Sequence, residues 1–437
     1  MAGGLIIAAP QSGTGKTVIA AGLLRLLRRR GIRVAAAKAG PDYIDAGFLA
    51  AASGAPCRNL DPWAMRAATL SGELRALEDG AELVLCEGVM GLFDGAGSAA
   101  RGSTAELALA TGWPVILVAD LQRQAASVAA LVEGFARHRA GVSIAGVIFN
   151  RVASPRHAAL AAEALQRSAL DIKLLGAVPR AEALGLPSRH LGLVPAGEIA
   201  EIGAFLDRAA AAIEAAIDTA ALVALARPAR RGNATRGAPF PPLGARIAIA
   251  RDAAFAFTYE TVLEAWRAAG AALSFFSPLA NEAPTPACDA VFLPGGYPEL
   301  FAGQLAGNRR FVDGLRDAAR RGATLYGECG GYMVLGRELV DAAGTAHAMA
   351  GLLPLATSFA ARKLHLGYRE ARLGAAGPLG AAGQAFRGHE FHYATVTAEG
   401  EGAPLFAVAD VEGAALGAAG RVAGKVMGSF VHLVDRA

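Results

Sequence analysis

The stretch LIIAAPQSGTGKTVIAAGLL, residues 5–24, decides the fold of the first half of the chain. It begins with an apolar run of the kind that forms a buried parallel strand. A loop with Gly13 and Gly15 follows, and Lys16 and Thr17 then start a helical pattern. Such a loop surrounds phosphate oxygens with backbone N–H groups, while the lysine reaches the outer phosphates and the threonine can hold Mg²⁺. We predict a nucleotide site here, although a proline stands where the consensus has its first glycine.

The composition limits the class of protein. The chain has 437 residues, too many for one core, so two domains are expected. With 54% apolar and 18% charged residues, it has the composition of a well-buried α/β protein rather than a disordered one. The net charge of +4 is small, and no Lys/Arg block with interleaved aromatic residues predicts nucleic-acid binding. No apolar run is long enough to span a membrane, and the apolar N-terminal run is too short for a secretory leader, so we expect a cytoplasmic protein.

Strand-like apolar runs alternate with amphipathic helical patterns in both halves of the chain, which predicts doubly wound α/β sheets. Between the halves, the stretch ARPARRGNATRGAPFPPLG is rich in Arg and Pro and has no acid, so we interpret it as an exposed linker. The predicted organisation is a first domain over residues 1–225, a linker over 226–242 and a second domain over 243–437. The runs are LIIAAP, RVAAAKAG, ELVLCEG, PVILVAD, IAGVIFN and LLGAVP, then RIAIARD, AALSFFSP, AVFLPGG, ATLYGECGG, EFHYATVT and KVMGSFVHLV.

Polar side chains follow the second and third strand-like runs of the first half. Ligands of such sheets gather at the carboxyl ends of the strands, so these side chains are expected near the phosphate loop. We predict that Thr17, Asp45 and Glu87 hold Mg²⁺, although any single acid would equally suit a helix cap or a solvated loop. The residues of this group are Lys38 near the end of the second run, Asp42, Tyr43 and Asp45 after it, Glu87 near the end of the third run, and Asp94 after that.

Two further polar positions are candidates in the first half. Asn150 ends a strand-like run, where its amide could pair with a nucleotide base or could be an ordinary turn asparagine. Ser188, Arg189 and His190 form a polar cluster in LPSRHLGLVP. An arginine suits bidentate recognition of a carboxylate, so this cluster indicates an acidic substrate, although a plain loop fits the spacing almost as well.

The second half contains a candidate nucleophile in GECGGYMVLG, residues 327–336. Cys329 follows a strand-like run, and glycines on both sides permit the strained turn of a nucleophile elbow. The helix expected after it would lower the pKa of the thiol. Backbone N–H groups of Gly330 and of Gly296, in FLPGGYPE, are candidates for an oxyanion hole. The other cysteines, Cys57, Cys86 and Cys288, lack such an elbow and form no Cys-x-x-Cys pair, so we expect free, buried thiols and no zinc site.

A cysteine nucleophile needs a base, and the second half offers five histidines. We prefer His432, which we place at the end of an apolar strand in VMGSFVHLV and therefore on the scaffold. Spacing alone does not decide between them. The five candidates are His347, His365, His389, His392 and His432.

Taken together and in order, motifs along nearly the whole chain resemble the cobyrinic or hydrogenobyrinic acid a,c-diamide synthases of cobalamin biosynthesis. The resemblance implies an N-terminal phosphate-loop domain of the dethiobiotin-synthetase type and a C-terminal domain like the class I glutamine amidotransferases. The motifs are PQSGTGKT, KAGPDYIDAGF, EGVMGLFDG, LPSRHLGLVP, RDAAFAFTY, FLPGGYPEL, GECGGYMVLG, GHEFHY and GSFVHL.

The resemblance also implies roles for individual residues. Cys329 would be the nucleophile that releases ammonia from L-glutamine, and His432 would be its base. The usual amidotransferase triad has a glutamate two residues after the histidine, where this chain has Val434, and Glu390 is a candidate substitute. The resemblance places Tyr43, Asp45 and Asp94 near the substrate carboxylate and the metal. With Asp42, Ser188, Arg189 and His190 they complete the expected substrate and metal region, while Gly13, Gly15, Lys16, Thr17, Lys38 and Asn150 would contact the nucleotide.

The implied reaction joins the two domains. ATP with Mg²⁺ would phosphorylate a side-chain carboxylate of hydrogenobyrinic or cobyrinic acid, because an unactivated carboxylate has no good leaving group. Ammonia would then displace phosphate, first at one and then at the other of the c and a side chains. Ammonia is protonated readily in bulk water, so a sheltered path between the domains is expected. A homodimer is one possibility for the assembly, and whether the corrin ring contains cobalt is left open.

Three alternatives stay open at this point. A cobyric acid synthase would amidate other side chains of the corrin, but its members are usually longer, and LPSRHLGLVP favours the a,c enzyme. A phosphate-loop regulatory ATPase would need no glutaminase activity, and it leaves the Cys329 elbow without a purpose. A stand-alone thiol hydrolase would leave the phosphate loop without one.

Overall fold

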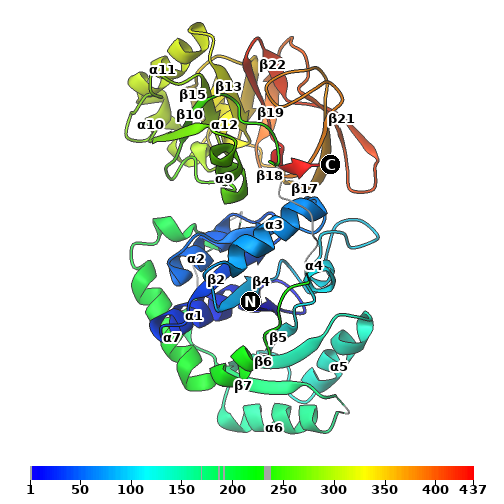
Figure 1. The fold of residues 1–437 in the computed structure, drawn as a ribbon. Helices are drawn as coiled ribbons and strands as arrows, with labels where there is room; N and C mark the ends of the chain where they lie inside the picture. Colours follow the sequence, from blue (N-terminus) through cyan, green and yellow to red (C-terminus); the bar gives the residue numbers. More distant parts are fainter. Residues whose placement is uncertain (1, 169, 186–187, 190–191, 231–237) are drawn as a thin grey trace. The chain divides into compact units, whose positions relative to one another are not determined.

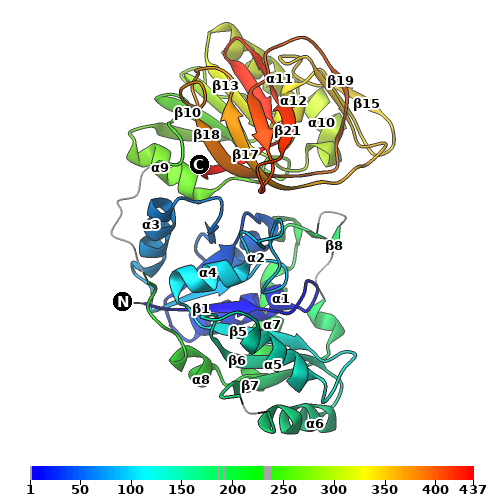
Figure 2. The same cartoon turned by 90° about the vertical axis from the view of Figure 1, so that its right-hand side faces the viewer.

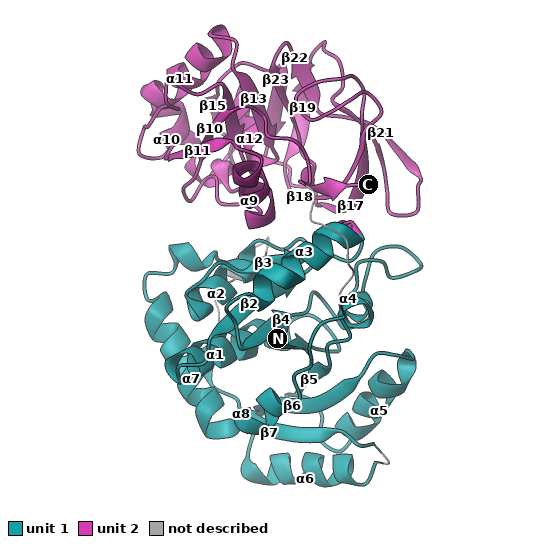
Figure 3. Ribbon diagram, viewed as in Figure 1, with its two compact units in different colours: residues 1–63, 67–236 teal, residues 64–66, 237–437 magenta. Residues whose placement is uncertain are grey.

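The computed structural model describes residues 2–168, 170–185, 188–189, 192–230 and 238–437. The chain forms two compact units (Figure 3). The first contains residues 1–63 and 67–236, and the second contains residues 64–66 and 237–437. In the described part of the chain, no helix is both long and apolar enough to cross a membrane.

The first unit is built on a seven-stranded sheet in which every pairing is parallel. Its spatial order is β3-β2-β4-β1-β5-β6-β7, so the loop after β1 lies between the ends of two neighbouring strands, β4 and β5 (Figure 1). The six strand-like runs predicted for this half all form strands of the sheet, and the sequence missed only the short β3. The strands are β1 (Gly3–Ala8), β2 (Val34–Ala39), β3 (Arg58–Leu60), β4 (Leu83–Glu87), β5 (Val115–Asp120), β6 (Ile144–Val152) and β7 (Lys173–Pro179).

Helices cover both faces of this sheet. Successive residues of β1 belong to different cores: Leu5 and Ile7 pack into one, and Ile6 and Ala8 into the other. The first core is closed by α1 (Lys16–Arg29), α2 (Ile44–Ser53), α7 (Ile202–Ala216) and α8 (Thr219–Ala224), and the second by α3 (Ala67–Glu78), α4 (Thr104–Thr111), α5 (Val128–His138) and α6 (Pro155–Gln166). The predicted doubly wound fold is therefore confirmed for this unit. The remaining elements are the 3₁₀ turns η1 (Glu182–Leu184) and η2 (Ala196–Glu198) and the hairpin β8 (Ser188–Arg189) and β9 (Gly192–Leu193).

The second unit contains a six-stranded sheet of order β11-β10-β12-β13-β23-β22, parallel except for its last pairing. Its strands are β10 (Arg246–Ala250), β11 (Ala272–Phe276), β12 (Ala290–Leu293), β13 (Thr324–Glu328), β22 (Arg421–Ala423) and β23 (Val426–Ser429). The helical elements of the unit are α9 (Glu260–Ala268), η3 (Pro298–Phe301), α10 (Ala302–Gly307), α11 (Arg309–Arg320) and α12 (Gly330–Leu335).

Two smaller sheets complete the second unit, and the sequence did not predict them. One has the order β15-β14-β16-β19, and the other is antiparallel with the order β21-β20-β17-β18-β24 (Figure 2). Their strands are β14 (Glu338–Val340), β15 (Ala346–Ala348), β16 (Leu355–Ser358), β17 (His365–Leu373), β18 (Ala385–His392), β19 (Thr395–Glu399), β20 (Phe406–Ala409), β21 (Ala415–Ala419) and β24 (His432–Arg436).

Two stretches that were each predicted as one strand are divided between sheets. EFHYATVT spans the end of β18 and the start of β19, and KVMGSFVHLV spans β23 and β24. His432 therefore begins a strand, and the prediction that it ends one was wrong. The physical reason is a turn at Ser429, whose hydroxyl accepts a hydrogen bond from the N–H of Val431 over 3.1 Å and so redirects the chain between the two sheets.

Described residues at both ends of the stretch interpreted as a linker make contacts within the two units. Arg227 pairs with Gly4, and the N–H of Arg230 donates to the carbonyl of Thr111 over 2.7 Å, so this part follows the first unit. Phe240 is 1% exposed and packs edge-on against Trp266 in the second unit. An apolar side chain within a proline-rich stretch can thus join a core, and the boundaries 225 and 242 stay predictions.

We expect Gly4→Ala to lower the free energy of unfolding by about 1–3 kcal/mol, the usual cost of overpacking. A Cβ at this position of β1 would overlap the indole of Trp113, which is itself 1% exposed. Urea denaturation followed by tryptophan fluorescence and far-UV circular dichroism measures the change.

The matched control is Gly134→Ala within α5, where a Cβ meets nothing within 4 Å. This change should be neutral or stabilising by up to about 1 kcal/mol, because glycine is a poor helix former. Equal losses in the two variants would contradict the packing argument.

Candidate active sites

The phosphate loop of the first unit depends on its glycines. Gly13 and Gly15 have φ values of 78° and 90°, in the left-handed region that favours glycine. The amide nitrogen of Asn150 donates to the carbonyl of Thr14 over 2.7 Å, and a Cβ on Gly15 would lie 2.5 Å from that nitrogen. Lys16 then begins α1. Asn150 thus holds the loop from the end of β6, and its predicted contact with a nucleotide base stays a prediction.

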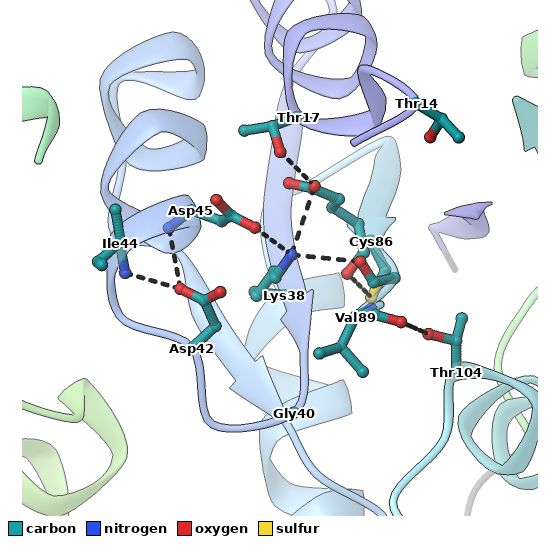
Figure 4. Close-up of polar contacts among 12 residues, drawn as sticks. Thr14, Thr17, Lys38, Gly40, Asp42, Ile44, Asp45, Cys86, Val89 and Thr104 are labelled. Atoms are coloured by element: carbon teal, nitrogen blue, oxygen red, sulfur yellow. Dashed lines mark hydrogen bonds and ion pairs between the residues drawn. The ribbon is translucent and has the colours of Figure 1, made fainter. Parts of the chain in front are cut away.

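Lys38 lies at the centre of a buried charge cluster beside this loop (Figure 4). It is the register partner of Glu87 across β2 and β4. Its Nζ donates to Asp45 Oδ2 over 2.6 Å and to the carbonyl of Gly88 over 3.2 Å, and it lies 3.3 Å from Glu87 Oε1. The hydroxyl of Thr17 donates to the same Glu87 oxygen over 2.7 Å. The strand register therefore brings together four side chains that sequence analysis had assigned to nucleotide and metal.

Burial controls the charges of this cluster. It raises the pKa of Glu87 to about 7, although Lys38 and Thr17 oppose the shift. Burial alone would lower the pKa of Lys38, but the negative charges of Asp45 and Glu87 outweigh burial, so the pKa of Lys38 is raised. Burial lowers the pKa of Lys16, with Glu87 acting against it. Because desolvation disfavours the charged form of Lys16, an anionic partner such as a nucleotide phosphate would restore that form.

The geometry fits a magnesium ion at Thr17 and Glu87. Glu87 Oε2 is buried and has no hydrogen-bond partner among the described residues, which leaves it available as a ligand. Asp45, the third predicted ligand, is in an ion pair with Lys38. The described residues contain no group of three or more His, Cys, Asp or Glu arranged around a metal. Such a group is not required, because Mg²⁺ bound with a nucleotide takes most of its ligands from phosphate and water.

The residues expected near the substrate lie in loops around this cluster. Asp42 Oδ1 accepts hydrogen bonds from the N–H groups of Ile44 and Asp45 at the start of α2, and burial raises its pKa to about 6. Asp94 Oδ2 accepts from the N–H of Gly91 over 2.9 Å. Tyr43 directly precedes α2. Ser188 and Arg189 form β8, but the structure describes only their backbone, and His190 lies outside the described residues.

Cys329 of the second unit lies on a strained turn between β13 and α12. Its φ is 47° and its ψ is −104°, a conformation rare for any residue with a side chain. Its N–H donates to the carbonyl of Ser429 over 2.8 Å, which fixes the turn to the neighbouring strand. Gly331 is required after it, because a Cβ there would overlap the carbonyl of Leu293. This is the geometry expected of a nucleophile elbow.

The predicted oxyanion donors and base lie around the elbow. A Cβ on Gly330 would lie 3.1 Å from the nitrogen of Gly296, so the two candidate N–H groups are neighbours. The ring of His432 lies against Gly295, where a Cβ would overlap its Cε1 atom. Its Nδ1 atom lies 3.8 Å from Oε2 of Glu328, the residue before Cys329. The assignment of Cys329, His432, Gly296 and Gly330 to catalysis stays a prediction, and this grouping supports it.

The expectation of a low thiol pKa was wrong. Cys329 is 2% exposed, and burial, followed by the nearby Glu299 carboxylate, raises the pKa of the thiol. The N–H of Gly330 acts in the predicted direction but is outweighed. The thiol is therefore protonated at rest, and a nucleophilic role requires a base to remove its proton. Burial also lowers the pKa of His432, which keeps its imidazole neutral and able to accept that proton.

The other cysteines and histidines have different surroundings. All four cysteines are free, but Cys57 is only partly buried, in contrast to the prediction, while Cys86 and Cys288 are buried. His347 pairs with Asp341 over 2.8 Å. The ring of His392 stacks on that of Phe430 with the centroids 3.9 Å apart, and on that of His365.

The immediate neighbours of His432 were not predicted from the sequence. His389 stacks on it with the ring centroids 4.9 Å apart and the planes 9° apart, and the hydroxyl of Tyr259 lies 2.8 Å from His389 Nε2. Glu328 was passed over although it adjoins the nucleophile. No spacing rule could find these contacts, because they join β13, the residue before α9, β18 and β24 across the unit.

The raised pKa of Glu87 predicts a pH dependence of stability in the absence of nucleotide and Mg²⁺. The folded value is about 7, above the ordinary value of about 4.3, so folding takes up a proton between these pH values. The free energy of unfolding should be highest below about pH 4.3 and should fall as the pH rises toward 7. The fall should be about 1–3 kcal/mol larger in the wild type than in Glu87→Gln. Urea denaturation at pH 5 and pH 8 measures it. Glu163→Gln, which removes an exposed carboxylate, is the control. A Glu87→Gln protein with the same pH dependence as the wild type would contradict the raised pKa of Glu87.

Comparison with known proteins agrees with both sites. Residues 5–194 match the CobQ/CobB/MinD/ParA nucleotide binding domain, and residues 246–436 match the CobB/CobQ-like glutamine amidotransferase domain. The chain is 54% identical to a hydrogenobyrinate a,c-diamide synthase of Brucella suis over 99% of this chain and 98% of the relative. Proteins of the same name from Rhizobium meliloti and Rhodobacter capsulatus are each 52% identical, over 99% of this chain and 99% and 98% of their own lengths. The resemblance and the fold class predicted from the motifs are confirmed, and the chain belongs to the family of hydrogenobyrinate a,c-diamide synthases.

Proposed function

We propose that this protein is an ATP- and glutamine-dependent ligase that amidates the a and c side-chain carboxylates of hydrogenobyrinic acid. The observation that carries the proposal is the alignment, at 54% identity over 99% of the chain, with a protein named for that activity. The relatives' names favour the cobalt-free acid over cobyrinic acid and over the substrate of a cobyric acid synthase. The two sites support the proposal, because it needs one site for a nucleotide and one for a nucleophile.

The second unit would release ammonia. His432 takes the proton of the Cys329 thiol as the sulfur attacks the carboxamide carbon of L-glutamine. The N–H groups of Gly296 and Gly330 stabilise the negative charge on the carboxamide oxygen. The C–N bond then breaks, the proton passes from His432 to the leaving nitrogen, and ammonia departs. Water hydrolyses the remaining γ-glutamyl thioester to glutamate and restores the thiol.

The first unit would activate the acid. An oxygen of the corrin carboxylate attacks the γ-phosphorus of ATP, ADP leaves, and an acyl phosphate forms on the substrate. Ammonia then attacks the acyl carbon, and phosphate leaves with the oxygen. Lys16 and the loop N–H groups would hold the phosphates, and Lys38 would balance the charges of Asp45 and Glu87.

Mg²⁺ would lie at Thr17 and Glu87, with Asp45 as a third candidate ligand. When bound, the ion neutralises the charge that develops on the phosphate oxygens. Asn150 is the proposed contact to the base, and the substrate contacts are Asp42, Tyr43, Asp94, Ser188, Arg189 and His190. A cytoplasmic location and a homodimer stay predictions.

We expect Cys329→Ser to lose glutamine-driven amidation by about 10³-fold or more, since a serine hydroxyl is a far weaker nucleophile here. Amidation with added ammonium salt should continue at the wild-type rate, because the first unit is unchanged. The measurement incubates each protein with ATP, Mg²⁺ and hydrogenobyrinic or cobyrinic acid and determines the product masses. A Cys329→Ser protein that uses glutamine normally would disprove the thiol role, and a wild-type protein that amidates neither acid would disprove the proposed function.

Lys16→Ala should lose amidation with both nitrogen sources, by about 10²- to 10³-fold, because one cation that holds the phosphates is removed. Glutamine hydrolysis by the second unit, measured as glutamate formed, reports whether the rest of the protein is intact. Lys173→Ala, at an exposed lysine of β7, is the matched control and should keep both activities. Normal ammonium-driven turnover by Lys16→Ala would count against the phosphate role.

A further inference from the structure

The proposed base His432 has no acid two residues later, where the usual triad has its glutamate. The position two residues later is Val434, an apolar side chain that is 2% exposed. An imidazole that accepts a proton in a buried site needs a nearby negative charge, because a buried imidazolium is otherwise costly. A carboxylate that faces the Nδ1 atom of His432 would meet this need.

Glu328 meets this requirement. Its Oε2 atom lies 3.8 Å from Nδ1 of His432, and the two side chains are 4% and 1% exposed. This distance is within ion-pair range but longer than a hydrogen bond, and catalytic contacts of this kind often tighten when substrate binds. The contact follows from topology, since β13 ends at Glu328 and β24 begins at His432.

Burial raises the pKa of Glu328 to about 8, although the hydrogen bonds from Leu433 and Tyr326 oppose the shift. A positive charge on His432 beside it favours the ionised form of the carboxyl group, so the two groups become charged as a pair. The Glu328 side chain is also fixed in orientation. The hydroxyl of Tyr326 at 2.9 Å and the N–H of Leu433 at 3.2 Å both donate to Oε1. Oε2 is thereby turned toward His432. Because Leu433 follows His432 in β24, the same carboxylate is tied to the backbone that carries the base.

Glu390, the substitute suggested by the sequence, is engaged elsewhere. Its Oε2 accepts from Nε of Arg369 over 2.5 Å. The neighbouring His389 instead stacks on the face of the His432 ring, with planes 9° apart. The ring is thus held on its face by an imidazole and at its Nδ1 edge by Glu328.

We propose that Glu328 is the positioning residue of His432 and takes the place of the triad carboxylate. The proposal rests on the proposed glutaminase role of Cys329. When the S–H bond breaks and Nε2 of His432 gains the proton, Nδ1–H of the resulting imidazolium faces Oε2 of Glu328, which stabilises the positive charge. The proton then leaves with ammonia, and the pair returns to its resting state. Glu328 itself forms no bond to substrate.

The test is Glu328→Gln, which keeps an oxygen to accept from Tyr326 and Leu433 but removes the charge. We expect kcat for glutamine hydrolysis to fall on the order of 10²-fold, while KM for glutamine changes by less than about twofold. Alkylation of Cys329 by a glutamine-analogue diazoketone, which needs the same activated thiol, should slow in parallel. Amidation with ammonium salt should stay at the wild-type rate.

Glu390→Gln is the matched comparison. The proposal is overturned if Glu390→Gln gives the kcat-only loss and Glu328→Gln hydrolyses glutamine at the wild-type rate, or if Glu328→Gln changes KM and not kcat. If Glu328→Gln fails to fold, the deciding variant is Tyr326→Phe, which removes one hydrogen-bond donor to the Glu328 side chain. A several-fold fall in kcat for glutamine hydrolysis supports the proposal, and an unchanged kcat overturns it. Cys329→Ser in the same assay distinguishes failure of the Glu328 proposal from failure of the proposed function. If the proposed glutaminase role of Cys329 fails, the Cys329→Ser protein stays active with glutamine. If only the Glu328 proposal fails, the Cys329→Ser protein is inactive with glutamine.

Discussion

The ion pairs of Lys38 are the interaction on which the first site depends. A buried lysine is tolerated only where carboxylates compensate its charge, and here Asp45 and Glu87 do so. The register of β2 against β4 places Lys38 beside Glu87, so the sheet itself determines the charge arrangement next to the phosphate loop. Glu87 in turn accepts from Thr17 at the start of α1. Strand pairing, charge balance and the proposed metal position are thus linked by one carboxylate.

In the second unit, strand pairing again determines where the site residues lie, although the chemistry differs. The parallel pairing of β13 with β23 sets the position of the elbow, because the N–H of Cys329 donates to Ser429. The chain then leaves this sheet and enters the antiparallel sheet at His432. The proposed nucleophile and its proposed base are therefore contributed by two sheets that meet at a turn of two residues. Nothing in the local sequence of either strand indicates this meeting.

The sequence predicted what depends on local pattern. Apolar runs identified all but one strand of the first sheet, and the phosphate loop and the Cys329 elbow were recognised from their glycines. It failed where burial and tertiary contact decide: the direction of the thiol pKa shift, the partial exposure of Cys57, the burial of Phe240 and the break before His432. The two smaller sheets of the second unit escaped because most of their strands are short, and because the longer β17 and β18 lack continuous apolar runs. Glu328 escaped because its contact to His432 spans more than a hundred residues of chain.

The burial of Cys329 has a consequence outside turnover. Peroxides and other electrophiles react with thiolate far faster than with thiol. The sulfur of Cys329 is 2% exposed and its thiol has a raised pKa, so it is poorly accessible to these reagents and is protonated. The resting enzyme should therefore resist oxidative inactivation without a reducing partner.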